Sequence, residues 1–462
     1  MVLALIAALG GCAVAPIPKL DRETVSHWRH QEGKPGVPPV DLHGWWKAFD
    51  DPALNHLVDS ALKSNPDAAG ALYRLRAERA LYRVHRAPNQ PQLRARTDDP
   101  IDPDASASYF VIGFDATWEL GLFGRGAATD RIAAGRLGEA DAALREVRVS
   151  LVAEVVREFI QLRAAQRREQ LLQRIVDARR RQAKLEQTRV KLHLDSPTAL
   201  AQANARVAAA RAALSGPRAA LNAAAERLAV LLGRDEPDAT WLKPGTLPAL
   251  GPDGPIEAPA DLLRSRPEIA RARARVLQAA GELGIAHANR MPRIGLGTSL
   301  LWSTNIATYR PTGGTNDIGT VGPIIDIPLF DWGMRKARET AQSDELKAAV
   351  LAYRKAVLAG VADVETALGN LGEQRHREDA IRQVCAVWKN ARIVQRTRRR
   401  LGLASDLESA RIDIASTKAE LKLAAARRDR DIGYVALYKA LGGAPPLPAS
   451  DDTAAGSGKQ AP

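Results

Sequence analysis

The feature that most constrains the fold of this sequence is an internal duplication. Motifs of the first half recur in the second half, 201 residues later near its start and 209 residues later further on. One insertion in the polar, Gly-rich stretch 304–317 explains the change of spacing. Self-similarity of this kind predicts two copies of one supersecondary unit. The matched segments are Asn65-Pro66-Asp67 with Arg266-Pro267-Glu268, Pro91 with Pro292, Phe123-Gly124 with Trp332-Gly333, Lys191-Leu192 with Arg400-Leu401, and Leu232-Gly233 with Leu441-Gly442.

Two long stretches without proline set the dimensions of each copy. Residues 127–192 and 334–401 contain no proline. As continuous helices they would form rods of roughly 100 Å at 1.5 Å per residue. Their apolar residues recur at close to the helical period, and a pattern of this length is typical of coiled coils and helical repeats rather than of a globule.

A shorter helix is predicted to return along each long one, over residues 197–232 and 406–441. Both are rich in alanine and can approach their neighbours closely. Pro217 is expected to kink the first return helix, because proline lacks the backbone N–H that a helix interior needs. Its counterpart in the second copy is Ala426, so the two copies should differ there.

Between the first helix and the long helix, each copy contains a predicted β-hairpin, at 91–120 and 293–330. Apolar and polar residues alternate over about ten positions, as in transmembrane β-barrel strands. A soluble sandwich hairpin gives the same pattern. Four strands cannot close a barrel, and an open edge is not tolerated in lipid, so the chain is expected to oligomerise. The clearest apolar face comprises Phe110, Ile112, Phe114, Ala116 and Trp118.

The two copies are predicted to span residues 51–233 and 262–443. A Pro- and Gly-rich linker joins them over residues 234–261. The tail 444–462 consists mostly of small residues and proline without periodicity, which is typical of disorder.

The N-terminal segment resembles a lipoprotein signal. An uninterrupted apolar run at 2–9 precedes Gly10, Gly11 and Cys12, and an apolar run that ends in small residues is typical of a secretion signal. We therefore expect residues 1–11 to be removed, Cys12 to carry acyl chains such as palmitate, and residues 12–50 to form a lipid-anchored extension. A small buried cysteine is the alternative.

Composition and missing motifs exclude most other functions. The 66 Lys and Arg exceed the 53 Asp and Glu by 13, but they are spread over every helix with little aromatic interleaving, so nucleic-acid binding is not expected. The sequence has no phosphate-binding glycine loop, zinc-protease motif or nucleophile elbow. Two cysteines rule out a Cys-based zinc site. We expect no enzyme, no cofactor and no metal site.

Three further segments carry a family resemblance. They are 45–54 (WWKAFDDPAL), 117–125 (TWELGLFGR) and 328–333 (PLFDWG). Together with the lipobox-like 9–12, they resemble the lipoprotein branch of the TolC/OprM/NodT-like outer-membrane efflux proteins, over roughly residues 9–443. The resemblance implies a mainly α fold with a small β part. In it, a trimer forms a long-helix α-barrel and a transmembrane β-barrel with four strands from each chain.

The resemblance also implies a function and its partners. The chain would be the outer-membrane exit duct of a tripartite efflux pump, reaching into the periplasm. It would receive substrates from a periplasmic adaptor (membrane fusion) protein and an inner-membrane RND-type transporter. Type I secretion or metal efflux through the same fold is one alternative. A lipid-anchored periplasmic coiled-coil scaffold without a pore is an alternative from another class.

The tips of the two helix hairpins are the expected contact with the adaptor. Family members carry a Gly-Leu-x-Ser pattern there, which residues 402–405 keep, whereas histidine replaces the glycine at 193–196. Both serines could equally be plain helix caps. The residues expected to meet the adaptor are His193, Leu194, Ser196, Gly402, Leu403 and Ser405.

The resemblance places a narrow periplasmic aperture just past the second tip. Acidic residues form it in the family. Here Glu408 occupies the first position, but the second is Arg411, a reversed charge. A salt bridge between Glu408 and Arg411, within or between chains, is the hypothesis for a closed gate. An ordinary surface pair three residues apart is the alternative.

Overall fold

The structure of the chain is a computed structural model that describes residues 17–20, 28–30, 42–98, 109–248, 250, 266–305 and 316–445. Cys12 and the signal segment lie outside the described residues. So do residues 249 and 251–261 of the linker, most of the inserted loop and almost all of the tail.

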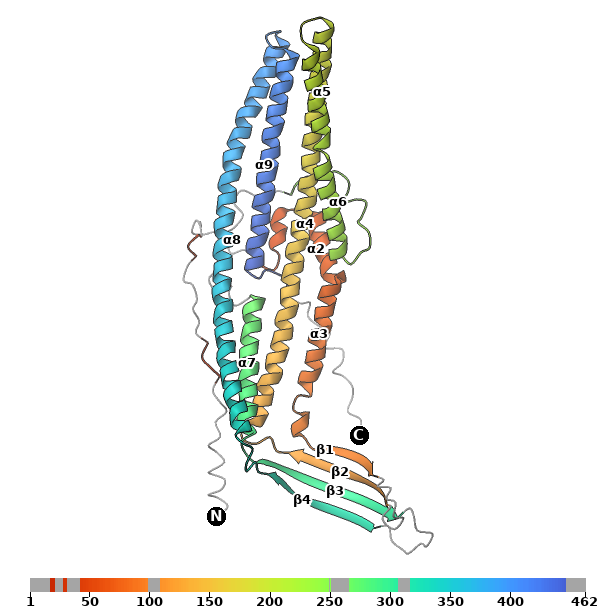
Figure 1. The fold of residues 1–462 in the computed structure, drawn as a ribbon, viewed down its shortest axis with the longest axis vertical. Helices are drawn as coiled ribbons and strands as arrows, with labels where there is room; N and C mark the ends of the chain where they lie inside the picture. The colour runs from red at the N-terminus through yellow and green to blue at the C-terminus, as the bar shows by residue number, and fades with distance from the viewer. Residues whose placement is uncertain are drawn as a thin grey trace. The chain divides into compact units, whose positions relative to one another are not determined.

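Both copies follow one order of elements, as Figure 1 shows. Helix, two strands, a long helix and a returning helical segment succeed one another in each. The first copy contains α2 (Pro52–Ser64), α3 (Pro66–Arg83), β1 (Gln92–Asp98), β2 (Tyr109–Glu119), α4 (Arg125–Lys191), α5 (Pro197–Ala212) and α6 (Ser215–Leu231). The second contains α7 (Pro267–Ala288), β3 (Arg293–Asn305), β4 (Asn316–Asp326), α8 (Met334–Arg400) and α9 (Asp406–Ala440). The short 3₁₀ helices η1 (Trp45–Phe49) and η2 (Ala87–Asn89) precede α2 and β1.

The chain divides into two compact units. One comprises residues 1–23, 73–143 and 268–357 and includes the whole sheet. The other comprises residues 24–72, 144–267 and 358–462 and includes both helix hairpins.

The sheet of the first unit is antiparallel throughout, in the order β1-β2-β3-β4. Strand register puts Phe114 opposite Leu300 and Trp118 opposite Leu296, and all four side chains are exposed on one face. On the other face, Ser299 donates a hydrogen bond to Asp115 at 2.6 Å. Within the chain, β1 and β4 each have one unpaired edge.

Small residues let the helices of this unit approach closely. A Cβ on Gly135 of α4 would lie 2.9 Å from the carbonyl oxygen of Ala274 in α7, and one on Gly281 of α7 would lie 2.7 Å from the carbonyl oxygen of Ala128. Only glycine fits such backbone contacts. Close helix contact of this kind explains how a chain with 5% aromatic residues packs long helices together.

The hairpin unit has an aromatic core around the 45–54 segment. Trp45 stacks on Tyr438 of α9 with ring centroids 5.3 Å apart, and Phe49 meets Tyr434 edge-on at 5.7 Å. The indole N–H of Trp45 donates to the carbonyl oxygen of Gly443. Residues 45–49 of this unit are thereby fixed to the C-terminal part of α9 and to Gly443.

The two returning segments differ at Pro217. In the first copy the helix is interrupted at residues 213–214, so α5 and α6 replace the single expected helix 197–232. Pro217 is the third residue of α6, where a missing N–H costs least. In the second copy α9 is continuous through Ala426, which is fully buried.

Candidate functional site

The first hairpin tip is closed by a left-handed residue. His193 follows α4 with φ of 51°. Its N–H donates to the carbonyl oxygen of Val190, and the N–H of Leu194 donates to that of Arg189. These two bonds are those of a Schellman motif, which satisfies the last carbonyl groups of a helix.

The second tip repeats this geometry 209 residues later. Gly402 has φ of 72° and donates to the carbonyl oxygen of Arg399, and Leu403 donates to that of Arg398. The two tips therefore have the same backbone conformation, although only one has the glycine. Histidine adopts the left-handed region more readily than most residues but at a cost that glycine does not incur.

This difference predicts opposite effects of exchanging the two residues. His193→Gly should raise the free energy of unfolding by about 1 kcal/mol, and Gly402→His should lower it by a similar amount. Guanidinium unfolding of the detergent-solubilised protein measures both. Two changes of the same sign would contradict a conformational cause.

Serine caps fix both returning helices. The Ser196 Oγ accepts from the N–H of Ala199 at 3.2 Å, and the Ser405 Oγ accepts from the N–H of Glu408 at 3.1 Å. Each tip is thus held from both sides, by the Schellman bonds and by the cap. The tips present leucines that are 62–67% exposed, which are Leu192, Leu194, Leu401 and Leu403.

The aperture residues do not form the predicted pair within one chain. Glu408 lies 3.9 Å from Arg398 on the opposite helix of its hairpin, and Arg411 is exposed. Glu408 also stands three residues after the Ser405 cap, a position that favours glutamate for local reasons. Within the chain Glu408 therefore pairs with Arg398 rather than with Arg411, and a gate formed by Glu408 and Arg411 stays a prediction.

A second feature recurs in each copy where the second strand leads into the long helix, from β2 to α4 and from β4 to α8. We call residues 120–124 elbow 1 and residues 329–333 elbow 2. Phe123 and Trp332 have φ of 55° and 56°, and the following glycines, Gly124 and Gly333, both have φ of 81°. The elbows share this pair of left-handed residues, but Gly121 of elbow 1 is also left-handed, with φ of 52°, and its counterpart Phe330 is not.

The elbows differ in what covers them. Elbow 1 packs against residues 288–294, where α7 passes into β3, and the N–H of Leu120 donates to the carbonyl oxygen of Ile294. Among the residues that the structure describes, Trp332 of elbow 2 makes one ring contact, edge-on with Phe330 at a centroid distance of 4.8 Å, and it is 90% exposed. The two sequence motifs match, but they do not predict this difference in exposure.

Comparison with known proteins assigns the family. The profile of the outer membrane efflux protein family matches residues 57–234 and 258–443. The chain belongs to this family. Outer membrane protein OprJ of Pseudomonas aeruginosa is 28% identical over 94% of this chain and 93% of its own length. The pyoverdine export outer membrane protein OpmQ of the same species is 29% identical over 96% of each chain.

Solved structures confirm the TolC-like fold of this outer membrane efflux protein. The outer-membrane channel OprN superposes with a TM-score of 0.80 at 28% identity, over 93% of this chain and 99% of the other. The open state of the Neisseria gonorrhoeae MtrE outer membrane channel gives 0.77 at 25% identity, over 93% and 98%. In the described part of the chain, no helix combines the length and apolarity needed to cross a membrane.

A buried charged network in the hairpin unit of this efflux protein escaped the sequence analysis. Glu378 of α8 is 2% exposed and lies within ion-pair distance of Arg382, Arg427 and Arg430, at 2.6, 3.2 and 2.8 Å. Asp431 is fully buried and accepts two hydrogen bonds from Arg430. Burial raises the pKa of Asp431 to about 7, and Arg430 opposes that rise. The Arg427–Glu378 pair is the counterpart of Arg218–Glu169 in the first copy, so the repeat offset could have revealed it.

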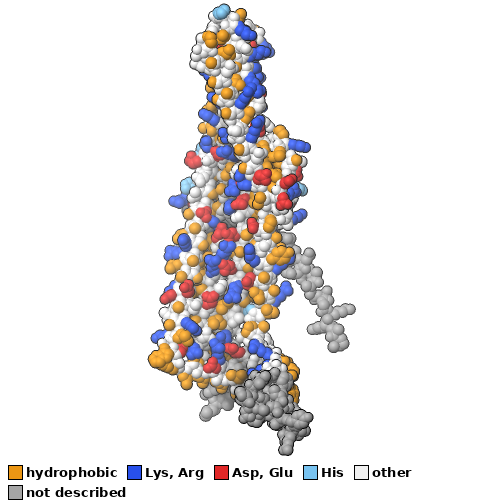
Figure 2. All heavy atoms as spheres, turned by 45° about the vertical axis from the view of Figure 1, so that its right-hand side comes forward, with side chains coloured by type: hydrophobic (Ala, Val, Ile, Leu, Met, Phe, Trp, Pro, Cys, Tyr) orange, Lys and Arg blue, Asp and Glu red, His pale blue; other side chains and the backbone are white. Residues whose placement is uncertain are grey.

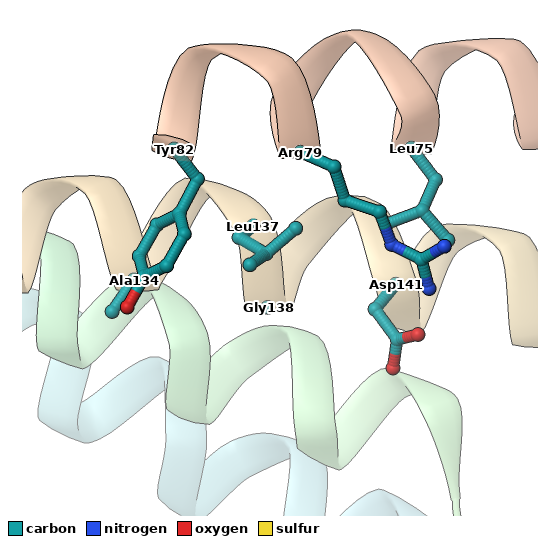
Figure 3. A pocket seen from close by; sticks show the side chains of 7 residues that line it. All are labelled: Leu75, Arg79, Tyr82, Ala134, Leu137, Gly138 and Asp141. Carbon is teal, nitrogen blue, oxygen red and sulfur yellow. The ribbon is translucent and has the colours of Figure 1, made fainter. Parts of the chain in front are cut away.

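A shallow groove of about 320 Å³ lies between α3 and α4 (Figure 3). Arg79 and Asp141 point toward one another at one end, and Tyr82 lies at the other. Leu137 occupies the middle. The charged groups face each other rather than a ligand, so the groove does not compete with the tips as a functional site.

Proposed function

We propose that three copies of this chain form the exit duct of a tripartite efflux system in the outer membrane. Substrates diffuse through the duct, and no step is catalysed. A periplasmic adaptor and an inner-membrane transporter deliver them. The family assignment and the similarity to OprJ and OpmQ support this proposal.

The observation that carries the assembly of several copies into a ring is the unmatched elbow 2, and the number three comes from the family resemblance. Within the chain, elbow 1 is covered by residues 288–294 of the next repeat. The equivalent cover for elbow 2 is residues 87–93, but in the same chain they lie at the opposite edge of the sheet, beside β1. A second copy can supply them. Such head-to-tail contacts close into rings, and three copies would give twelve strands with no free edge.

The repeat offsets also give the register between copies. In the β2–β3 pairing, the numbers of any two opposed residues have the same sum as those of Glu119 and Gly295. β4 is the repeat counterpart of β2, 209 residues later, and β1 is the counterpart of β3, 201 residues earlier. Applying these two offsets to the β2–β3 pairing places Asp326 opposite Arg96 of the next copy and Ile327 opposite its Ala95. Opposite charges then meet across the new strand pair, which supports this register.

The hairpin tips supply the proposed adaptor contact. Their backbone is fixed by caps and Schellman bonds, and four exposed leucines offer apolar area to a partner. We assign Glu408 and Arg411 to the entrance that adaptor binding opens.

Lipid anchoring at Cys12 is part of the proposal, since acyl chains add about 0.8 kcal/mol of membrane affinity per buried methylene. Cargo of another kind, such as a secreted protein or metal ions, would use the same duct.

The register predicts a specific cross-link. Ile327→Cys combined with Ala95→Cys, in a Cys385→Ala background, should give covalent trimers under oxidising conditions, because opposed strand residues fall within disulfide range. Ile325→Cys with Ala95→Cys is the matched control, two residues out of register. Non-reducing gels of isolated outer membranes measure both. Monomers in every variant, released from the membrane by Cys12→Ala and silent in lipid bilayers, would instead support the periplasmic scaffold.

A further inference from the structure

Positive charge is concentrated at the hairpin tips. The equivalent segments 177–211 and 386–420 contain the tip ends of the two hairpins. They hold sixteen Lys and Arg and seven Asp and Glu, which is nine of the chain's thirteen excess positive charges. On the face in view, Figure 2 shows Lys, Arg and hydrophobic side chains at this end of the molecule and few acidic ones.

Every acidic residue of these segments lies within ion-pair distance of an arginine, although Arg189 is shared by two carboxylates and Arg174 lies outside the segments. Their carboxylates therefore do not offset the remaining cations. The ion pairs are Asp177–Arg180 (3.3 Å), Glu186–Arg189 (3.6 Å), Asp195–Arg189 (3.3 Å), Asp406–Arg399, Glu408–Arg398 (3.9 Å), Asp413–Arg392 (2.8 Å) and Glu420–Arg174 (3.2 Å).

Several cations are left over around the tips. Lys191, Arg400 and Arg411 are exposed and have no ion-pair partner among the residues that the structure describes. Nearby cations also repel each other: the pKa of Arg179 is lowered, first by burial and then by the charge of Arg206. The excess is therefore a property of the folded tips and not only of the sequence.

In a duct, this excess acts on whatever enters. An α-helix with its side chains is about 10–12 Å across, and the Debye length at physiological salt is about 8 Å. Cations on the inner face of a wall one helix thick therefore act directly on an ion that enters, whereas cations on its outer face, more than a Debye length away, are largely screened. Openings lined by one sign of charge concentrate ions of the opposite sign.

We propose that the tip end of the duct is an anion-selective entrance, and that its cargo consists of organic molecules bearing carboxylate, phosphate or similar anionic groups. The inference rests on the proposed duct and names its substrate class. Arg411 is central to it, since the reversed charge at the aperture gives the entrance a cation where the family resemblance implies an acid.

Ion selectivity of the full-length protein tests the proposal. In planar lipid bilayers under a KCl gradient, the reversal potential should show chloride to be more permeable than potassium. The triple variant Lys191→Gln, Arg400→Gln, Arg411→Gln should lower the chloride-to-potassium permeability ratio by about twofold for each charge removed, from Coulomb's law at about 8 Å in water with screening over one Debye length. The matched control, Arg273→Gln, Lys336→Gln, Lys355→Gln, removes three cations outside the tip segments and should change the ratio much less. Heat-resistant trimers on gels verify assembly of every variant.

A second measurement does not depend on conduction. Thr198→Cys at the first tip, in a Cys385→Ala background, should react faster with an anionic than with a cationic thiol reagent, relative to the same ratio at Ala352→Cys on α8. A conducting trimer that prefers potassium, with no rate preference at Thr198→Cys, would overturn the inference while leaving the duct intact. The basic tips would then serve an acidic protein surface instead. A trimer that carries no current would overturn the proposed function, and the thiol rates would still decide the sign of the potential.

Discussion

Deleting Gly402 to Ser405 is expected to abolish export while leaving the trimer assembled. The deletion removes the left-handed residue, the exposed Leu403 and the Ser405 cap in one step. None of these groups belongs to the sheet or the elbows, from which we derive the contact between copies. In cells that lack the native gene and express the deletion variant, export should fall to the level of cells that express no copy of the protein.

The chain supplies a matched control for this deletion. Replacing residues 402–405 with the sequence of residues 193–196 keeps the Schellman geometry and the cap, because both tips share them. This exchange should retain most export, and its stability should fall by about the 1 kcal/mol expected of a left-handed histidine. Heat-resistant trimers on gels and export assays separate assembly from function. Full export by the deletion variant would show that the second tip does not contact the adaptor.

Periodic sequence patterns predicted the long helices and the two repeats, and the family resemblance of the motifs implied the TolC-like fold class. A helix of 67 residues leaves a long apolar stripe, and duplication gives each motif a second occurrence. The TolC-like fold class is confirmed by the solved channels. The position of the helix break was also encoded, since the absence of an N–H at Pro217 acts locally.

The partner of Glu408 within the chain differs from the one that sequence spacing suggested, for a physical reason. Spacing along one helix suggested that Glu408 would pair with Arg411, three residues on. In the folded hairpin, the preceding helix brings Arg398 to the same carboxylate. Competition between a partner on the same helix and one across a hairpin depends on packing distances that sequence spacing does not contain.

The sequence does not predict the exposure of elbow 2, for a different physical reason. Phe123 and Trp332 occupy equivalent positions with the same backbone angles. Their surroundings differ because the second repeat covers elbow 1, whereas the residues that would cover elbow 2 belong to the first repeat and lie at the far edge of the sheet. Repeat matching detects the motif, and only the fold reveals which copy lacks its neighbour.

Glu378→Gln is expected to lower the free energy of unfolding by about 3–5 kcal/mol. The Glu378 carboxylate is almost fully buried and faces three arginines. Neutralising it leaves Arg430, itself buried, with only Asp431 as a counter-ion. Removing one partner of a buried ion pair leaves an uncompensated charge in a low-dielectric interior, which is costly.

The first copy provides the matched control, because Glu169 and Arg218 are the repeat counterparts of Glu378 and Arg427. Their ion pair is shorter, 2.7 Å against 3.2 Å, but the Glu169 side chain is 31% exposed against 2% for Glu378. Water therefore compensates the loss, and Glu169→Gln should cost less than about 1 kcal/mol. Denaturant unfolding of both variants against the parent protein measures the two costs. The Glu169 carboxylate pairs with one arginine and the Glu378 carboxylate with three, so a larger cost at Glu378 measures burial and the additional partners together. Equal costs would mean that neither burial nor the additional partners determine how strongly this network holds the hairpin unit together.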